Sequence, residues 1–171
     1  MGWSLDVTEK RPEKCVLCLA PHTSNWDFVV GMLYSGAEGI RSKFLMKKEW
    51  FFWPLGGAIR RAGGIPIWRD RHMSMTDHLA YKAIKAKDFC LCVTPEGTRS
   101  PNPEWKRGFY VIAMKAAIPI LLYGLDYEKR KIVCRRAIIP NGDVEGQIRD
   151  IKLYYKDFKG KVPENFDIGD L

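Results

Sequence analysis

Apolar positions along this chain fall either into short continuous runs or into stretches with helical spacing. The run Lys14–Ala20 (KCVLCLA) predicts a buried strand, and Phe89–Val93 (FCLCV) predicts a second strand of the same character. Shorter or less uniform runs predict further extended segments at Phe44–Met46, Ile65–Ile67, Ile120–Tyr127 and Lys131–Ala137.

Helical spacing marks the segments between these strands. One helix is predicted to start near Ser24, and others are predicted over Ser74–Lys87, Lys106–Ala117 and the amphipathic stretch Asp143–Lys159. Strands that alternate with helices indicate an α/β fold. We expect a single layered domain over residues 1–171, with a mixed, largely parallel central sheet flanked by helices.

The composition is that of an ordinary globular domain, with 46% hydrophobic and 28% charged residues in a chain of 171. No run approaches the roughly 20 apolar residues that span a bilayer. The longest candidates, Phe51–Ile59 and Ala116–Leu125, are short and interrupted by proline and glycine. A protein of this kind that handles lipid is expected to lie on a membrane and not to cross it.

The balance of charges favours a polyanionic partner, because 28 Lys and Arg residues against 20 Asp and Glu residues give a formal net charge of +8. Nucleic acid, an anionic bilayer and an acidic carrier protein all fit that description. The sequence matches no helix-turn-helix, RRM or zinc-finger pattern, so no nucleic acid is expected. The five cysteines are odd in number, and Met1–Lys14 lacks the apolar run of a secretory signal. We therefore expect reduced thiols and a cytoplasmic location.

The spacing Cys15-x-x-Cys18 resembles that of a zinc site. Residues three apart on a strand point to opposite faces, however, so the two sulfurs would not converge on one ion. We interpret both thiols as small buried apolar groups and expect no metal site.

Two polar stretches directly follow predicted strands. Pro21–Asp27 comes after Lys14–Ala20, and Thr94–Ser100 comes after Phe89–Val93. Because ligands of open α/β sheets bind beyond the carboxyl ends of strands, the two stretches are candidates for one site.

The residue types in these stretches suit acid–base chemistry and anion binding. His22 is a candidate general base, and the carboxylate of Asp27 can fix the tautomer of its imidazole. Asp27 has an alternative role, because Ser24-x-x-Asp27 is a capping-box pattern that stabilises a helix start without catalysis. Glu96 is a candidate to hold a hydroxyl group, and the planar guanidinium of Arg99 suits a phosphate. The alternative for this second stretch is a Pro-x-Gly turn with a solvated arginine.

The pair of motifs is more specific than either part. His22-x4-Asp27 and Glu96-Gly-Thr-Arg99, with 74 positions between their first residues (96 − 22), resemble motifs one and three of the lysophospholipid acyltransferase family, whose archetype is 1-acylglycerol-3-phosphate acyltransferase. Three other segments are similar to further motifs of that family, in the correct order: Met46–Pro54, Gly64–Arg69 and Ile118–Ile120. The likeness covers roughly Cys15 to Tyr127.

Some features depart from the family pattern. Trp68 stands where the second motif often has an acidic residue, and Trp50 stands where leucine is usual. Only Met1–Glu13 precedes the first predicted strand, so we expect none of the N-terminal membrane helices that many members carry. These differences bear on the acceptor head group and on the mode of membrane attachment.

The resemblance implies a glycerolipid acyltransferase-like fold and the transfer of a fatty acyl group from a thioester to the hydroxyl of a lysophospholipid. The donor would be acyl-CoA or acyl carrier protein, acting as co-substrate, with no other cofactor. The default acceptor is 1-acylglycerol-3-phosphate, in phospholipid biosynthesis, and a lyso-aminolipid is an alternative. In this mechanism His22 removes the hydroxyl proton and Asp27 orients His22. A non-catalytic lipid- or carrier-binding module is a further alternative, but a pure binder has no need for that base.

Basic residues near the motifs are candidates for binding the acceptor phosphate, namely Arg99, Arg69 and Lys47. For each of them the alternative is a solvated surface charge. Thr98 and the backbone N–H groups around Gly97 are candidate donors to the developing oxyanion or to the acceptor.

The stretch Phe44–Trp53 gathers five aromatic residues beside Lys47 and Lys48. Aromatic rings at head-group depth next to lysines predict contact with an anionic membrane surface. The alternative is that these rings fill the core or line a tunnel for the acyl chain. A peripheral position on the inner face of the membrane is expected, and the sequence predicts no particular oligomeric state.

Overall fold

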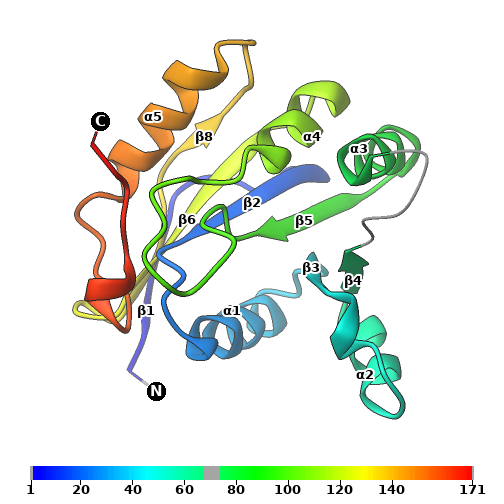
Figure 1. Cartoon of the computed structure of the whole chain (residues 1–171), viewed down its shortest axis with the longest axis horizontal. Helices are drawn as coiled ribbons and strands as arrows, with labels where there is room; N and C mark the ends of the chain where they lie inside the picture. Colours follow the sequence, from blue (N-terminus) through cyan, green and yellow to red (C-terminus); the bar gives the residue numbers. More distant parts are fainter. Residues whose placement is uncertain (1, 68–73, 171) are drawn as a thin grey trace.

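An eight-stranded sheet runs through the middle of the molecule in the computed structural model, which describes residues 2–67 and 74–170 (Figure 1). The strands are β1 (Ser4–Val7), β2 (Lys14–Ala20), β3 (Lys43–Lys47), β4 (Gly64–Ile67), β5 (Phe89–Val93), β6 (Ile120–Asp126), β7 (Lys131–Cys134) and β8 (Ala137–Ile138). Their order is β1-β7-β6-β2-β5-β3-β4, with β8 paired to β6. Only the pairs that β6 makes with β7 and β8 are antiparallel among the pairings described, so the predicted mixed, largely parallel sheet is confirmed.

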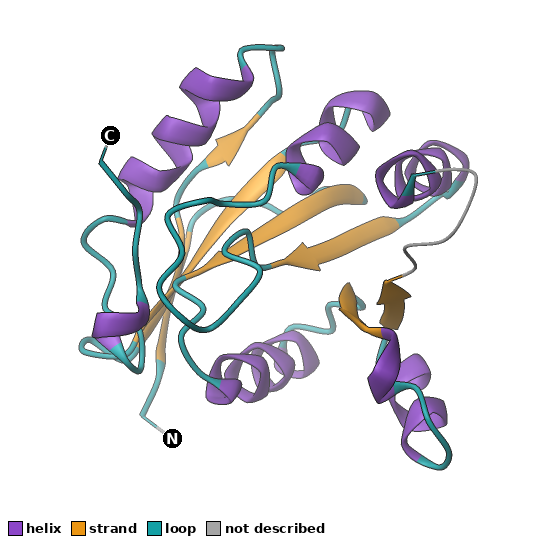
Figure 2. Cartoon of the chain, in the orientation of Figure 1, coloured by secondary structure: helices purple, strands orange, loops and turns teal. Residues whose placement is uncertain are grey.

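Helices cover both faces of this sheet (Figure 2). They are α1 (Asn25–Ala37), α2 (Leu55–Arg61), α3 (Met75–Lys85), α4 (Gly108–Ala116) and α5 (Val144–Tyr155), with short 3-10 turns η1 (Lys48–Trp50) and η2 (Pro163–Asn165). Helices α3, α4 and α5 lie on one face, whereas α1 lies on the other, which confirms the predicted α/β layers.

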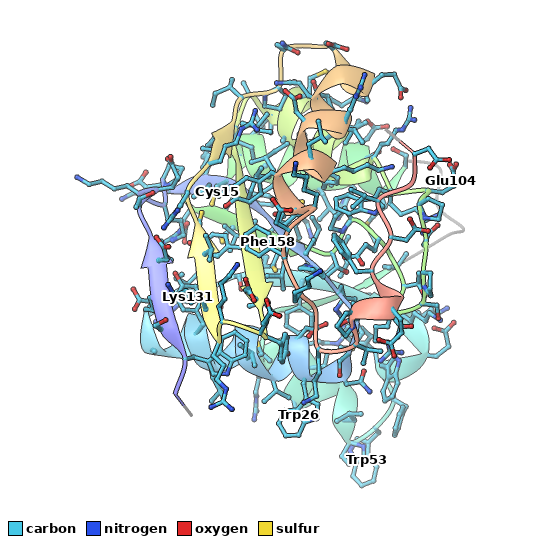
Figure 3. The ribbon with its side chains drawn as sticks, turned by 90° about the vertical axis from the view of Figure 1, so that its left-hand side faces the viewer. Cys15, Trp26, Trp53, Glu104, Lys131 and Phe158 are labelled. Carbon is cyan, nitrogen blue, oxygen red and sulfur yellow. The ribbon has the colours of Figure 1, made fainter. Side chains whose placement is uncertain are left out.

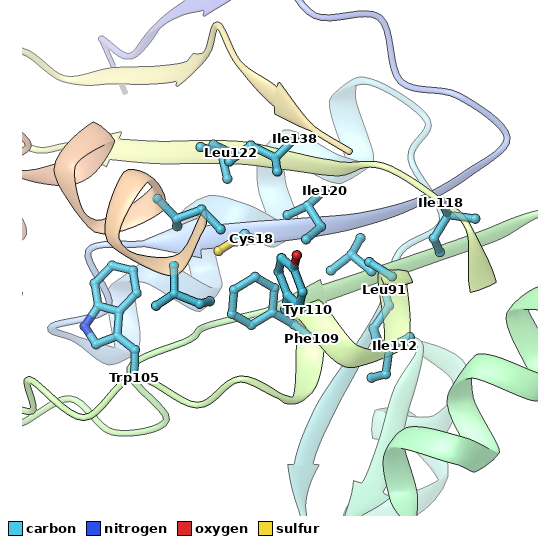
Figure 4. Packing of buried hydrophobic residues seen from close by; sticks show 14 of the residues in the cluster. Cys18, Leu91, Trp105, Phe109, Tyr110, Ile112, Ile118, Ile120, Leu122 and Ile138 are labelled. Carbon is cyan, nitrogen blue, oxygen red and sulfur yellow. The ribbon is translucent and has the colours of Figure 1, made fainter. Parts of the chain in front are cut away.

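The central strands are buried on both sides, which explains why their sequences are continuous apolar runs. On one face, Cys18 of β2 and Leu122 of β6 pack with Phe109 and Tyr110 of α4, as Figure 4 shows. On the other face, the alternate residues of these strands form a second cluster with Val30 of α1. The two core layers hold β5, β2 and β6 side by side, and the carboxyl ends of these three strands lie at one edge of the sheet.

The predicted single strand Lys131–Ala137 is in fact two strands separated by a bulge. Gly124 of β6 pairs with Val133, and Leu121 pairs with Ala137. The chain therefore advances by four residues where β6 advances by three, and the extra residue is accommodated at the two exposed arginines between β7 and β8.

Helix α2 and strand β1 were not predicted from the sequence. Glycine at positions 56 and 57 lowers the helix propensity of this segment, so propensity does not predict α2. The fold requires Gly56, because a Cβ there would lie 2.7 Å from the backbone carbonyl of Phe51. Strand β1 is only four residues long and pairs with β7 at the edge of the sheet.

Candidate active site

The two polar stretches meet beyond the carboxyl ends of neighbouring strands. Strand β2 leads to His22, and the parallel strand β5 leads to Glu96. The backbone N–H of His22 donates to Oε1 of Glu96 over 2.7 Å, so the two stretches contact each other directly although their sequence separation is 74 positions. The two stretches that are candidates for one site thus lie together at one edge of the sheet.

Asp27 is the centre of the first stretch, and its side chain is completely buried. Its Oδ2 lies 3.1 Å from Nδ1 of His22 and accepts the backbone N–H groups of Thr23 and Ser24, each over 2.8 Å. Its Oδ1 accepts the hydroxyl of Tyr127 over 2.8 Å. Four groups therefore surround one carboxyl, two of them from the backbone.

The capping-box contact of Asp27 and its contact with His22 coexist. Asp27 is the third residue of α1, and its contact with the N–H of Ser24 completes a capping box. The same oxygen faces the imidazole of His22. The start of the helix thus fixes the carboxylate in the position from which it contacts the ring.

His22 is only partly buried, and its side chain is 20% exposed. Because a carboxylate oxygen of Asp27 faces Nδ1, the tautomer with its hydrogen on Nδ1 can donate a hydrogen bond to that oxygen. Nε2 is then the nitrogen with a lone pair, able to take a proton from a ligand.

Glu96 is also buried, with 1% of its surface exposed, but its surroundings differ from those of Asp27. Burial raises the pKa of the Glu96 carboxyl to about 8; repulsion by the Asp27 carboxylate acts in the same direction, and the hydrogen bond from the N–H of His22 acts against it. This shift favours the protonated, uncharged form of the carboxyl, and a protonated carboxyl can donate a hydrogen bond as well as accept one.

Gly97 and Thr98 shape the turn after Glu96. Gly97 has φ +69°, a conformation that favours glycine, and its N–H donates to the carbonyl of Thr94 over 3.1 Å. The Thr98 hydroxyl oxygen accepts the N–H of Ser100 over 3.3 Å. The N–H of Gly97 is therefore used inside the turn, whereas the hydroxyl hydrogen of Thr98 is still able to donate.

The basic candidates occupy different positions. Arg99 is exposed, and its Nη1 donates to Oδ1 of Asn25 in the first turn of α1, which ties the second stretch to the first. Lys47 is exposed at the carboxyl end of β3, the strand beside β5, and thus at the same edge of the sheet. Arg69 and Trp68 lie outside the described residues.

The structure adds a residue that the sequence analysis did not propose for the site, Tyr127. It directly follows β6, the neighbour of β2 on the side away from β5, and its hydroxyl reaches Asp27. The rule used for the two polar stretches applies here too, because Tyr127 also lies just beyond a strand's carboxyl end. An isolated aromatic residue after an apolar run has no motif to distinguish it.

The C-terminal segment supports the same loop from outside. The carbonyl of Lys159 accepts the N–H of Tyr127 over 2.8 Å, and the N–H of Val162 donates to Oγ1 of Thr23 over 3.2 Å. Gly160, between these two contacts in the sequence, packs closely on Thr23, because a Cβ at this position would lie 2.6 Å from Oγ1 of Thr23. The segment around residues 159–162 therefore packs directly on the His22 loop.

The cysteines lie in the core. Cys15 and Cys18 belong to different core clusters on opposite sides of the sheet, as the strand geometry requires. Cys15 lies 4.0 Å from Cys90, sulfur to sulfur, on the neighbouring strand. In the part of the chain that the structure describes, no group of three or more His, Cys, Asp or Glu side chains is arranged to hold a metal ion. Among the same residues, no helix combines the length and the apolar character needed to span a bilayer.

Comparison with known proteins bears on the reaction class. No curated protein matches the chain by sequence. The family model described as Acyltransferase matches residues 5–123, which include both the His22 stretch and the Glu96 stretch, and it confirms the resemblance stated above. The chain therefore belongs to the acyltransferase family, that of the 1-acylglycerol-3-phosphate acyltransferase-like proteins.

Proposed function

We propose that this protein is an O-acyltransferase that moves a fatty acyl group from a thioester, acyl-CoA or acyl carrier protein, to the hydroxyl of a lysoglycerophospholipid. The default acceptor is 1-acylglycerol-3-phosphate, and no cofactor is proposed beyond the thioester co-substrate. The supporting observation is the imidazole of His22, held at Nδ1 by the buried Asp27 beside Glu96, in a chain of the acyltransferase family.

The proposed reaction is a direct transfer in one site. Nε2 of His22 takes the proton of the acceptor hydroxyl while the oxygen of that hydroxyl attacks the thioester carbonyl. The carbon–sulfur bond then breaks, an ester remains, and the departing thiolate receives the proton from the imidazolium. Asp27 keeps the ring in place and stabilises its positive charge in the meantime. The substrate hydroxyl takes the place of a serine nucleophile, so no acyl-enzyme is needed.

The acceptor head group is proposed to lie against the Glu96 loop. A phosphate carries negative charge, which an ionised carboxylate would repel. With its pKa raised to about 8 by burial, Glu96 is mostly neutral at pH 7 and is able to donate to a hydroxyl or phosphate oxygen. Arg99 and Lys47 are proposed to attract the phosphate, as is Arg69, which lies outside the described residues.

Contact with an anionic membrane surface is also proposed, with the protein peripheral to the inner face. Of the five rings in Phe44–Trp53, three are well exposed: Trp50 at 54%, Phe52 at 56% and Trp53 at 91%. Phe44 instead packs on Phe28, with ring centroids 5.0 Å apart. The three exposed rings favour contact with a membrane, whereas Phe44 packs against α1.

The direct test measures free thiol released from acyl-CoA by the purified full chain, with a panel of acceptors that includes 1-acylglycerol-3-phosphate and a lyso-aminolipid. Acyl carrier protein loaded with the same chain serves as second donor. We expect acceptor-dependent thiol release. Binding of the lipids without thiol release from either donor would refute the enzyme and favour a binding module.

A further inference from the structure

Helix α1 has an unusual outer face. Asp27 and Val30 are its buried residues, whereas Trp26, Val29 and Leu33 expose 53%, 39% and 52% of their surface. These three positions recur at helical spacing and form one stripe. After Asp27 the helix has no charged residue as far as its end at Ala37. A surface helix normally has a polar outer face, so this stripe indicates a surface that is covered in use.

The stripe continues onto the aromatic segment that follows β3. Phe28 of α1 packs against Phe44 of β3, which brings the two elements together. Figure 3 shows Trp26 and Trp53 at the same lower edge of the molecule, and α1 and α2 form that lower side in Figure 1. We define this apolar surface, the α1–α2 face, by six exposed residues: Trp26, Val29, Leu33, Trp50, Phe52 and Trp53.

Cations stand directly beside the rings of this face. The ammonium of Lys161 lies 5.4 Å from the ring of Trp26. The guanidinium of Arg60 lies 5.0 Å from the ring of Phe51, the residue between Trp50 and Phe52. Lys47 and Arg61, at the ends of β3 and α2, are exposed as well. Aromatic rings mixed with cations suit the head-group region of an anionic bilayer, where rings lie at the interface and cations meet phosphates.

We infer that the α1–α2 face docks on the surface of an anionic bilayer and so presents the His22 loop to the lipid. This inference rests on the proposed function for the identity of the lipid substrate, but the docking itself does not depend on catalysis. Trp26 lies between His22 and Asp27 in the sequence, so a bilayer that covers Trp26 lies next to these two residues. A second copy of the chain is a poorer occupant, because it would bring the cations of two such faces together.

The experiment compares matched glutamine variants in vesicle co-sedimentation. Leu33→Gln and Trp53→Gln alter the α1–α2 face, and Ile84→Gln is the control, because Ile84 is 53% exposed on α3, on the opposite side of the sheet. Glutamine keeps good helix propensity at both helical positions. With vesicles of phosphatidylcholine and phosphatidylglycerol, we expect each face variant to bind roughly tenfold more weakly and the control to bind like the wild type. Pure phosphatidylcholine vesicles should bind all four proteins weakly.

Three outcomes would overturn the inference. The first is equal vesicle binding by all four proteins, and the second is a loss of binding in Ile84→Gln as large as that in the face variants. The third is a wild-type protein that forms a dimer and does not bind vesicles, with a dimer that the Leu33→Gln substitution dissociates. Activity on a short-chain, water-soluble lysolipid separates this inference from the proposed function. We expect Leu33→Gln to match the wild type there. Absence of that activity in the wild type would refute the proposed function while the vesicle data still decide the docking.

Discussion

The two loops of the site surround their buried carboxyl groups differently. Asp27 faces four polar partners, including two backbone N–H groups and the hydroxyl of Tyr127. Glu96 accepts one backbone N–H, from His22, and burial raises its pKa to about 8. An ionised carboxyl can only accept hydrogen bonds, so the number of donors around it decides how well the fold tolerates its charge. Burial alone thus does not determine the state of an acid: polar groups surround the carboxyl of Asp27, whereas burial favours the neutral form of Glu96.

Removal of the proposed base, His22, should produce the largest effect. We expect His22→Ala to lower kcat by about 10²- to 10⁴-fold, the usual contribution of a general base, with the fold intact. His78→Ala on α3 is the matched control and should retain activity. Thiol release measures both variants, and circular dichroism checks their folding. If His22→Ala turned over substrate like the wild type, the first loop would have no catalytic role.

The second loop can be tested through its protonation. The pKa of Glu96 is raised in the folded state to about 8, so the folded protein holds this proton more tightly than the unfolded chain. The associated stability is therefore present at low pH and is lost as the pH rises from the ordinary glutamate range to about 8. We expect the free energy of unfolding of the wild type, relative to that of Glu96→Gln, to fall by an amount on the order of a few kcal/mol between about pH 5 and pH 8.

Urea unfolding at several pH values measures this difference, because the groups common to both proteins cancel in the comparison. Parallel pH profiles for the two proteins would mean that Glu96 is ionised in the folded state at neutral pH. The contrast between the two buried acids would then disappear.

Tyr127→Phe sharpens the comparison by removing one donor from Asp27. The lost hydrogen bond to a charged group should lower the free energy of unfolding by about 1.5–3 kcal/mol. The hydroxyl also helps to hold the carboxyl that contacts His22, so we expect kcat to fall in this variant while the acceptor KM changes little. Tyr34→Phe, which removes a hydroxyl contact to Tyr123 instead, is the control and should leave kcat unchanged. An unchanged kcat in Tyr127→Phe would reduce Tyr127 to a structural role.

Several features of the fold and of the site can be predicted from the sequence, because short stretches of sequence determine them. Strand β2 was predicted with its bounds because a strand buried on both faces is a continuous apolar run. The His22 and Glu96 stretches were candidates for one site because both follow predicted strands, and ligands of open α/β sheets bind beyond the carboxyl ends of strands; in the structure the two stretches are in contact. A helix start near Ser24 was expected, and Ser24 is the N-cap of α1, with the capping box that the sequence indicated.

The remaining features depend on the order of strands, which local pattern does not determine. Tyr127 and Asp27 are 100 positions apart, and they meet only because β6 lies next to β2 on the side opposite β5. The support from Gly160 likewise requires the C-terminal segment to return to the first loop. The stretch Phe28–Leu33 of α1 (FVVGML) has no polar position, so only the packing reveals that Val30 faces the core while Leu33 faces outward.

The smallest expected effect concerns Arg99, where the two loops join. Its guanidinium bonds to Asn25 at the start of α1 and remains exposed, so a planar fork is available at the point where the two loops meet. Arg99→Lys replaces that fork by a point charge, and we expect the KM for a phosphate-bearing acceptor to rise roughly three- to tenfold while kcat changes little. Arg149→Lys, on the exposed side of α5, is the control. An unchanged acceptor KM would remove Arg99 from the phosphate site. A fall in kcat without a change in KM would instead indicate that the contact with Asn25 holds the two loops in register for the chemical step.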